Sequence, residues 1–270
     1  MRVNEPVTQR EVWVEDNANI LSTTNKKGQI THINDEFIRI SGFSRDELIS
    51  EPHNIIRHPD MPRAAFDQMW QKLKSGKTWI GAVKNRCKNG DHYWVHVCAI
   101  PIMNEAGEIV ELQSVRTRLD LDVKSRAEAI YQKLKKQEPR KGFVEKVSFR
   151  RKTCITKSVP LLITTLTAIQ SVSTYFLSDS LIAAAEVAAI GFVGALIVSA
   201  MMSPFRRLVK KSREIIDDSV AEKIFTGRND SASSIELALI KQGSELDAVV
   251  KRMTEVIKDL NAGSEAVIAK

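Results

Sequence analysis

The sequence has few cysteines and no apolar segment at its N-terminus. Three cysteines occur among 270 residues, and no two of them have the close spacing of a zinc or redox motif; they are Cys87, Cys98 and Cys154. A scattered, odd set argues against a disulfide framework and for a reducing compartment. Residues 1–17 carry acids and a proline where a signal peptide needs an apolar run, so we expect the N-terminal part to stay in the cytoplasm.

Positive charge is present in excess, with a formal net charge of +7. Such an excess fits a nucleic-acid binder or a protein at a membrane surface. The basic residues gather on both sides of a long apolar region; they are Arg140, Lys141, Lys146, Arg150, Arg151, Lys152, Lys157, Arg206, Arg207, Lys210, Lys211 and Arg213. This placement explains the charge without nucleic acid, and it allows contact with anionic lipid headgroups.

The apolar region contains two stretches that are long enough to cross a membrane. Residues 158–178 contain no charge, and residues 181–205 are interrupted only by Glu186. A helix needs about 20 mostly apolar residues to cross a bilayer core. Because Lys and Arg stay on the cytoplasmic side, we predict a transmembrane hairpin at 158–204 with both ends in the cytoplasm. A buried helical hairpin in a soluble protein is the alternative.

Two features of the second stretch concern its placement and packing. Glu186 lies seven residues after Asp179, so we expect it near the membrane interface rather than on an ion pathway. The stretch is also rich in alanine and glycine, which suits close helix packing, including packing between subunits.

Residues 8–120 alternate between strand and helix patterns. Two short strand patterns surround an Asn-Lys-Lys-Gly turn, and Ser44 with Glu47 forms a capping box. A helix follows with Phe66, Met69, Trp70 and Leu73 on one face, and then three alternating segments are separated by glycine-containing turns. This order predicts an α+β domain in which helices pack on one face of an antiparallel sheet.

At residues 52–62, the proline-bounded turn PHNIIRHPDMP precedes the long helix. Arg57 offers a planar fork of donors for phosphate, His58 adds a donor or acceptor, and Asp60 can accept from ribose hydroxyls or brace the arginine. A dinucleotide such as FAD needs this kind of polar grip beside an aromatic slot. A turn held by its own Arg-Asp and Asx bonds, a two-histidine metal site and a haem with one axial histidine remain alternatives.

These residues resemble a known family. The element order, NDEFIRISGFSRDELI and KNRCKNGDHYWVHVCAIPI resemble a PAS domain, and HNIIRHPDMP is similar to the flavin-binding PAS domain of bacterial aerotaxis receptors. The resemblance implies a non-enzymatic redox sensor of the bacterial inner membrane that binds FAD and contains no metal. The cofactor-binding residues that it implies are Arg57, His58, Asp60, Asn34, His53, Phe66, Trp79, Asn85 and Tyr93.

Among these residues, Asn85 and Trp79 are the candidates for contact with the flavin ring. An asparagine amide both donates and accepts hydrogen bonds, which suits the ring edge, although aromatic residues in a small domain also serve as core. A membrane-tethered flavin oxidoreductase is a further alternative. However, the sequence has no nicotinamide fingerprint and no nucleophile beside a base.

The regions outside the sensor predict a linker and an adaptor. Residues 121–157 read as a basic helical linker, and residues 205–260 resemble a HAMP adaptor with a break at 226–234. Residues 261–270 are the start of a signalling helix or a tail. A seven-residue apolar repeat predicts a coiled coil and a homodimer or higher oligomer; it comprises Leu239, Leu246, Met253 and Leu260, with Val249 and Val256 between them.

The chain differs from aerotaxis receptors in one respect. Those receptors continue into a helical hairpin that controls a histidine kinase, and these 270 residues contain no such region. The chain is therefore either the input half of a longer receptor or a short member that acts on a partner. The resemblance implies a chemotaxis kinase and its coupling protein as the signalling partners.

Overall fold

The computed structural model describes residues 4–138, 148–151 and 155–268. The chain falls into two compact units, residues 1–148 with 240–270 and residues 149–239. Several predicted features lie outside the described residues: Cys154, part of the linker, and the basic residues Arg140, Lys141, Lys146 and Lys152.

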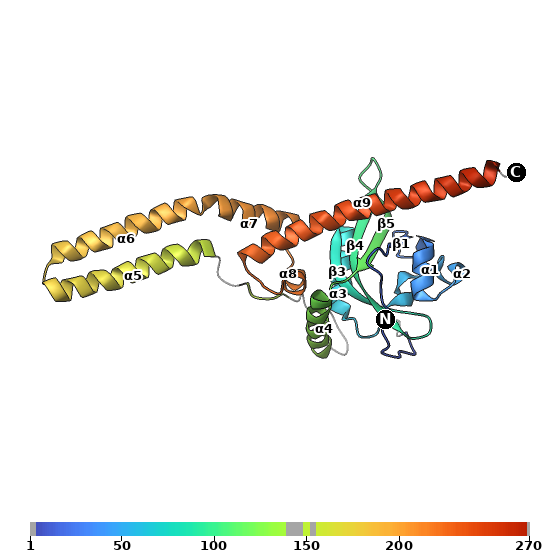
Figure 1. Cartoon of the computed structure of the whole chain (residues 1–270), viewed down its shortest axis with the longest axis horizontal. Helices are drawn as coiled ribbons and strands as arrows, with labels where there is room; N and C mark the ends of the chain where they lie inside the picture. The colour runs from blue at the N-terminus through green and yellow to red at the C-terminus, as the bar shows by residue number, and fades with distance from the viewer. Residues whose placement is uncertain (1–3, 139–147, 152–154, 269–270) are drawn as a thin grey trace. The chain divides into compact units, whose positions relative to one another are not determined.

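The first unit contains one five-stranded antiparallel sheet (Figure 1). In spatial order its strands are β2 (Ile30–Ile33), β1 (Ile20–Thr24), β5 (Ile109–Arg118), β4 (His92–Met103) and β3 (Trp79–Arg86). The β1–β2 connection includes Gly28 at φ +81°, and the β3–β4 connection includes Gly90 at φ +96°. Glycine adopts these left-handed conformations without the steric cost that a β-carbon adds.

Short helices join the second strand to the third. They are α1 (Asp35–Ser41), α2 (Arg45–Leu48), the 3₁₀ helix η1 (His53–Ile56) and α3 (Arg63–Lys74). A further helix, α4 (Leu121–Lys136), follows the last strand of the sheet. The predicted capping box is confirmed, because the Ser44 side chain accepts from Glu47 N and the Glu47 carboxylate accepts from Ser44 N. The structure therefore has the element order that the sequence predicts: two strands, then helices, then three antiparallel strands.

The core of this unit lies between the sheet and the short helices. The largest fully buried side chains there include Phe37, Ile20, Ile33, Leu48 and Tyr93. Burying a side chain of this size contributes roughly 1.5–3 kcal/mol. The alternating apolar positions seen in the sequence are therefore the positions that form the core.

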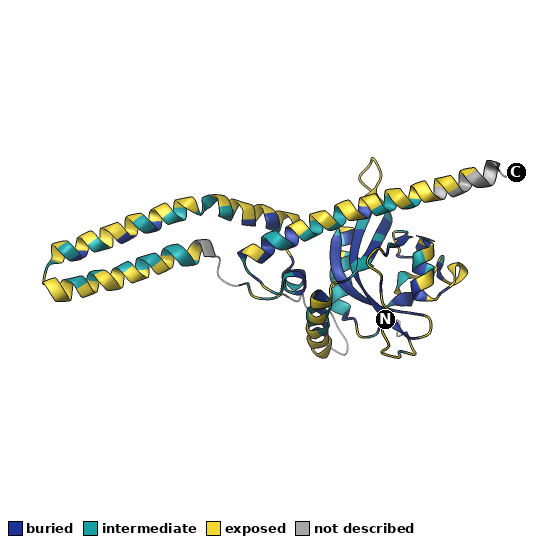
Figure 2. Cartoon of the chain, in the orientation of Figure 1, coloured by how far each residue is buried: buried dark blue, intermediate teal, exposed yellow. Residues whose placement is uncertain are grey.

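The second unit contains a pair of helices that are long and apolar enough to cross a membrane. These are α5 (Ile155–Ser178) and α6 (Leu181–Met201), with mean hydropathies of 1.3 over Lys157–Ser178 and 2.4 over Leu181–Met201. Their surfaces are mostly exposed (Figure 2), which distinguishes them from core helices of a soluble protein. Length and composition thus match the predicted hairpin.

Small residues allow the two apolar helices to pack closely. A β-carbon on Gly191 would lie 2.2 Å from Thr167 Oγ1 of α5, and Ser171 Oγ donates to Ala184 O at 2.6 Å. Glu186 is exposed on α6. The helices therefore meet through alanine and glycine positions of the kind that the sequence singles out.

Three helices follow the apolar pair: α7 (Ser203–Ile215), α8 (Ser219–Thr226) and α9 (Ser231–Ile268). The sequence predicts one break at 226–234, whereas the structure has an additional break at 216–218. Asp218 explains the additional helix, because its carboxylate accepts from Val220 N and Ala221 N and so caps α8. Gly227 ends α8 with φ +73°.

Candidate functional site

A cavity of about 390 Å³ lies in the first unit between the sheet, η1 and α3. This volume is within the range of small-molecule sites, about 300–1,000 Å³. The residues that line it are Thr24, Lys27, Gly28, Pro52, His53, Asn54, Ile56, Arg57, Arg63, Phe66, Asp67, Met69, Trp70, Leu73, Trp79, Val83, Asn85, Val97, Ala99, Leu112, Gln113, Ser114 and Arg116. The predicted face of the long helix is confirmed, since all four of its residues are among them.

Aromatic side chains form much of the wall. The Trp79 ring lies against Gly81, where a β-carbon would be 2.1 Å from Trp79 Cη2, and Trp79 Nε1 donates to Gln68 Oε1 at 3.3 Å. A β-carbon on Gly28 would likewise lie 2.8 Å from Trp70 Cη2. Both glycines therefore leave room for an indole ring, and these rings give the cavity flat apolar walls.

Arg57 enters the cavity from the proline-bounded turn. Its guanidinium carbon lies 3.9 Å from the centre of the Phe66 ring, and its Nη2 donates to Met61 O at 3.3 Å. Burial lowers the pKa of Arg57 to about 10, so the group remains a cation at neutral pH. Its buried Nε has no hydrogen-bond partner among the described residues.

Asn85 faces the same cavity from β3, beside Arg57. The two residues form an isolated antiparallel bridge, which adds the turn to the outer edge of the sheet. The buried Nδ2 of Asn85 also lacks a partner among the described residues. Two unpaired donors that line one cavity are costly unless a ligand accepts from them.

His58 and Asp60 do not line the cavity. Next to the Arg57–Asn85 bridge, His58 is fully buried, and Asp60 Oδ2 lies 2.7 Å from Lys84 Nζ. Lys84 precedes Asn85 on β3, so it points to the opposite side of the strand. The His58 and His92 ring centres are 5.4 Å apart. His58 and Asp60 therefore stabilise the side of the turn that faces away from the cavity, whereas Arg57 lies on the side that faces it.

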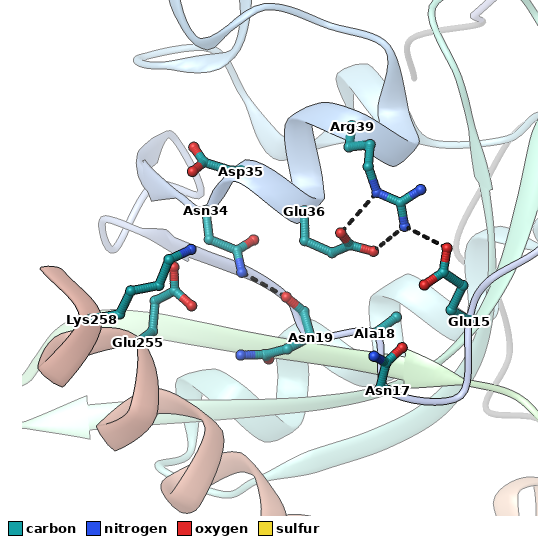
Figure 3. Close-up of a pocket in the computed structure, with 10 residues that line it drawn as sticks. All are labelled: Glu15, Asn17, Ala18, Asn19, Asn34, Asp35, Glu36, Arg39, Glu255 and Lys258. Carbon is teal, nitrogen blue, oxygen red and sulfur yellow. Dashed lines mark hydrogen bonds and ion pairs between the residues drawn. The ribbon is translucent and has the colours of Figure 1, made fainter. Parts of the chain in front are cut away.

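Asn34 and Tyr93 are also outside the cavity lining. Asn34 caps α1 and lines a separate polar pocket of about 400 Å³ (Figure 3), where its Nδ2 donates to Asn19 O at 2.6 Å. Tyr93 is paired with Asn85 across the sheet and is completely buried. Burial raises the pKa of the Tyr93 hydroxyl above its usual range. Neither residue therefore lines the cavity, although Tyr93 lies directly opposite the lining residue Asn85 on the neighbouring strand.

Arg116 is the main cavity residue that the sequence reasoning missed. It lies on the central strand β5 and is 2% exposed, with its Nη2 2.6 Å from His53 Nε2. Burial lowers the pKa of His53 to about 3, and the neighbouring Arg116 cation also lowers it, so His53 is neutral. Alternation along β5 contained a signal, because Leu112, Ser114 and Arg116 share one face.

The lining residues have a strong excess of positive charge. Lys27, Arg57, Arg63 and Arg116 are cationic, and Asp67 is the one carboxylate among the described lining residues. No group of three or more His, Cys, Asp or Glu in the described ranges could hold a metal ion. The cavity thus combines aromatic walls, unpaired donors and cations, which suits a flat, anionic organic ligand.

Comparison with known proteins identifies the fold. A family model described as the PAS fold matches residues 30–116. This part of the chain has a PAS fold. The match includes β2, β3, β4 and most of β5, and the antiparallel sheet with its helices agrees with it. The fold class predicted from the sequence is therefore confirmed.

Curated relatives extend this result. The aerotaxis receptor of Escherichia coli (strain K12) is 47% identical over 128 residues, which cover 47% of this chain and 25% of that receptor. The nitrogen fixation regulatory protein of Klebsiella pneumoniae is 29% identical over 96 residues, covering 36% and 19%. The chain is thus a homologue of the aerotaxis receptor over its PAS region, as the resemblance predicts, and its match spans a quarter of that receptor's length.

Solved structures with similar folds include the light state of the blue-light photoreceptor Aureochrome1 LOV. That similarity has 16% sequence identity and a TM-score of 0.39, and it covers 41% of this chain and 89% of the other.

Proposed function

We propose that the chain is a redox sensor whose PAS domain binds FAD. The observation that carries this proposal is the cavity of about 390 Å³, with its indole walls, its two unpaired donors and its cationic lining. Homology to the aerotaxis receptor over this region supports the assignment. In this proposal the chain has no enzymatic output, and its response is a change of conformation.

The cavity residues divide into two groups with different tasks. Trp79 and Phe66 flank a flat ring, and Asn85 Nδ2 donates a hydrogen bond to its polar edge. Arg57, with Lys27 and Arg63, neutralises the phosphates. When bound, FAD supplies the ability to accept and release electrons. Only an interaction that differs between the two redox states can shift the protein's conformation.

The remaining predicted site residues support this cavity and its arginines without a proposed contact to the cofactor. Asp60 binds Lys84 at 2.7 Å, and His58 Nδ1 accepts from Asp60 N at 3.1 Å, so both stabilise the turn that carries Arg57. His53 orients Arg116 through the short contact to its ring nitrogen. In this proposal Asn34 and Tyr93 support the walls from α1 and β4.

Haem is the rival cofactor, and the geometry disfavours it. Among the described lining residues, His53 is the one histidine, and its Nε2 already accepts from Arg116 at 2.6 Å. Axial ligation through that atom requires the contact to break. A thiol-dependent oxidoreductase is disfavoured, because burial raises the pKa values of the Cys87 and Cys98 thiols to about 12.

We further propose that α5 and α6 anchor the sensor in the bacterial inner membrane. The basic residues on both sides of the hairpin support a topology with both ends in the cytoplasm. Helices α7 to α9 then form a HAMP-like adaptor that passes the signal to a chemotaxis kinase and its coupling protein.

The oligomer is proposed to form along α9. Its heptad residues are largely exposed, with Leu239 at 63%, Leu246 at 70%, Met253 at 61% and Leu260 at 66%. A stripe of this length on one helix is typical of a coiled-coil seam. We therefore expect two or more copies of the chain to pair through it.

We expect Leu246→Glu to weaken self-association of the full chain by roughly tenfold or more, because two carboxylates would then face an apolar seam. Light scattering across a concentration series in mild detergent measures the change. Leu246→Met is the matched control, since it keeps an apolar side chain of similar size. If the glutamate variant self-associated as tightly as the wild type, α9 would not be the surface through which the copies pair.

Cofactor identity is tested with the intact protein. We expect the full chain, purified in mild detergent, to show a flavin spectrum and to release FAD when it is denatured. A Soret band would move the function to haem-based sensing. A colourless protein that also fails to take up added FAD would contradict the proposed function.

A further inference from the structure

Arg116 occupies an unusual position for a positive charge. Its side chain is 2% exposed on the central strand, where Arg116 is paired with Ile20 of β1 on one side and Val97 of β4 on the other. It nevertheless lines the cavity. The charge therefore sits where water screens it least.

Within the described residues, Arg116 contacts a hydroxyl, an imidazole and a ring face, and none of these groups is a carboxylate. Both of its terminal nitrogens donate to Ser22 Oγ at 3.1 Å, and Nη2 lies 2.6 Å from His53 Nε2. Its guanidinium carbon is 5.3 Å from the centre of the Phe37 ring. Because His53 accepts this hydrogen bond while neutral, it adds no negative charge.

A buried cation without a nearby negative charge is destabilising, because burial removes the water that would solvate it. A methionine or leucine could fill the same volume without that cost. The other cavity cations differ, because Lys27 is exposed and Arg57 and Arg63 are only partly buried. Arg116 is therefore the lining charge whose cost water offsets least, and a negative charge on a bound group would offset it.

We propose that Arg116 is the counter-charge for the bound flavin ring, so that the cavity holds the ring more tightly once electrons have arrived on it. This inference rests on the proposed function and adds a specific role to one residue. Two electrons delivered by an external reductant, together with one proton taken up from solvent, leave the ring with one net negative charge. No bond to the protein forms or breaks, and Arg116 keeps its proton throughout. Ser22 and His53 act as positioning residues for the guanidinium.

The test measures the midpoint potential of flavin in the full chain, in mild detergent, during stepwise reduction with dithionite beside a redox dye. Arg116→Gln removes the charge, and Arg116→Lys keeps it. Arg118→Gln is the matched control on the same strand face, because it makes the same change of charge outside the cavity. The guanidinium carbon of Arg118 instead lies 4.3 Å from the centre of the Trp13 ring, and Arg118 forms an ion pair with Asp16.

We expect Arg116→Gln to lower the ratio of reduced-state to oxidised-state flavin affinity at least tenfold, seen as a more negative midpoint potential. Arg116→Lys should remain within about threefold of the wild type, and so should Arg118→Gln. Flavin content, measured after denaturation, should stay above half of the wild-type value in all variants.

Three results would overturn the inference. The first is an unchanged potential in Arg116→Gln with flavin retained. The second is an equal shift in Arg118→Gln, which would indicate a general effect of net charge. The third is loss of flavin from Arg116→Gln or from both Arg116 variants, which would give the residue a role in holding the oxidised cofactor or in packing. A wild-type protein without flavin would instead contradict the proposed function itself.

Discussion

Arg57→Ala is expected to weaken flavin binding by roughly tenfold to a hundredfold while membrane insertion remains intact. Of Arg57, His58 and Asp60, the arginine is the one that lines the cavity, with its guanidinium carbon 3.9 Å from the Phe66 ring centre. Hydrogen bonds to charged groups contribute about 1.5–3 kcal/mol, and a factor of ten in affinity corresponds to about 1.4 kcal/mol. Flavin content per protein after purification, and titration with added FAD, measure the loss.

Two variants separate the role of Arg57 from a general effect on the turn. Arg57→Lys keeps the charge but loses the planar fork, so we expect an intermediate affinity. Arg45→Ala removes an arginine that does not line the cavity and should bind flavin normally. If Arg57→Ala retained full flavin at low FAD concentration, the assignment of the turn would be wrong.

Asp60→Ala is expected to lose flavin by a different route. The carboxylate binds Lys84, whose side chain is only 4% exposed, so its removal leaves a buried ammonium ion with less compensation. We therefore expect this variant to lose both flavin and stability, whereas Arg57→Ala loses mainly flavin. Thermal unfolding of the two variants distinguishes these routes.

Acidification from pH 7.5 to pH 5 is expected to destabilise the PAS domain by about 2 kcal/mol through His53 alone. Burial and the Arg116 cation lower the pKa of His53 from 6.5 to about 3. Between these values the unfolded state binds a proton that the folded state does not. The contribution of neutral His53 to the free energy of unfolding is therefore present in full above pH 6.5, and it is lost as the pH falls toward 3. His58 shifts in the same direction, to about 4, because of burial and Lys84.

Tryptophan fluorescence during denaturant unfolding measures this loss, because all four tryptophans lie between residues 13 and 94. The signal therefore reports this domain within the full chain. His53→Gln is the matched variant, since its amide oxygen can accept from Arg116 without titrating in this range. Its pH-dependent loss should be clearly smaller than that of the wild type. Equal losses in both proteins would show that His53 is not the titrating group.

Local sequence patterns predicted the elements of the PAS domain. Ser44 and Glu47 form the capping box because a cap depends on residues three positions apart. The helix face with Phe66 and Trp70 follows from a period of 3.6 residues, and it lines the cavity as that period requires. These features depend on neighbouring residues, so a single sequence contains them. The same is true of the additional helix α8, whose Asp218 cap was present but was not recognised.

The pairing register between distant strands decided which residues form the site. A single sequence does not contain this register. Arg57, His58 and Asp60 read as one motif, but the bridge between Arg57 and Asn85 makes the turn a continuation of the sheet edge. Side chains then alternate, so Arg57 faces the cavity while His58 is buried on the other side, near His92. Alternation along β5 places Arg116 on one face with Leu112 and Ser114, but only the position of this strand between β1 and β4 buries it in the sheet centre.

The sequence by itself determined the PAS fold, the two apolar helices and the group of residues from which the site is drawn, because periodicity, caps and hydropathy act over a few residues. The tertiary structure alone decided which of those residues meet in one cavity. That outcome depends on strand pairing between segments far apart in the chain, where a shift of one residue reverses which side chains face inward. Arg57 and Arg116 lie 59 positions apart and line the same cavity for that reason.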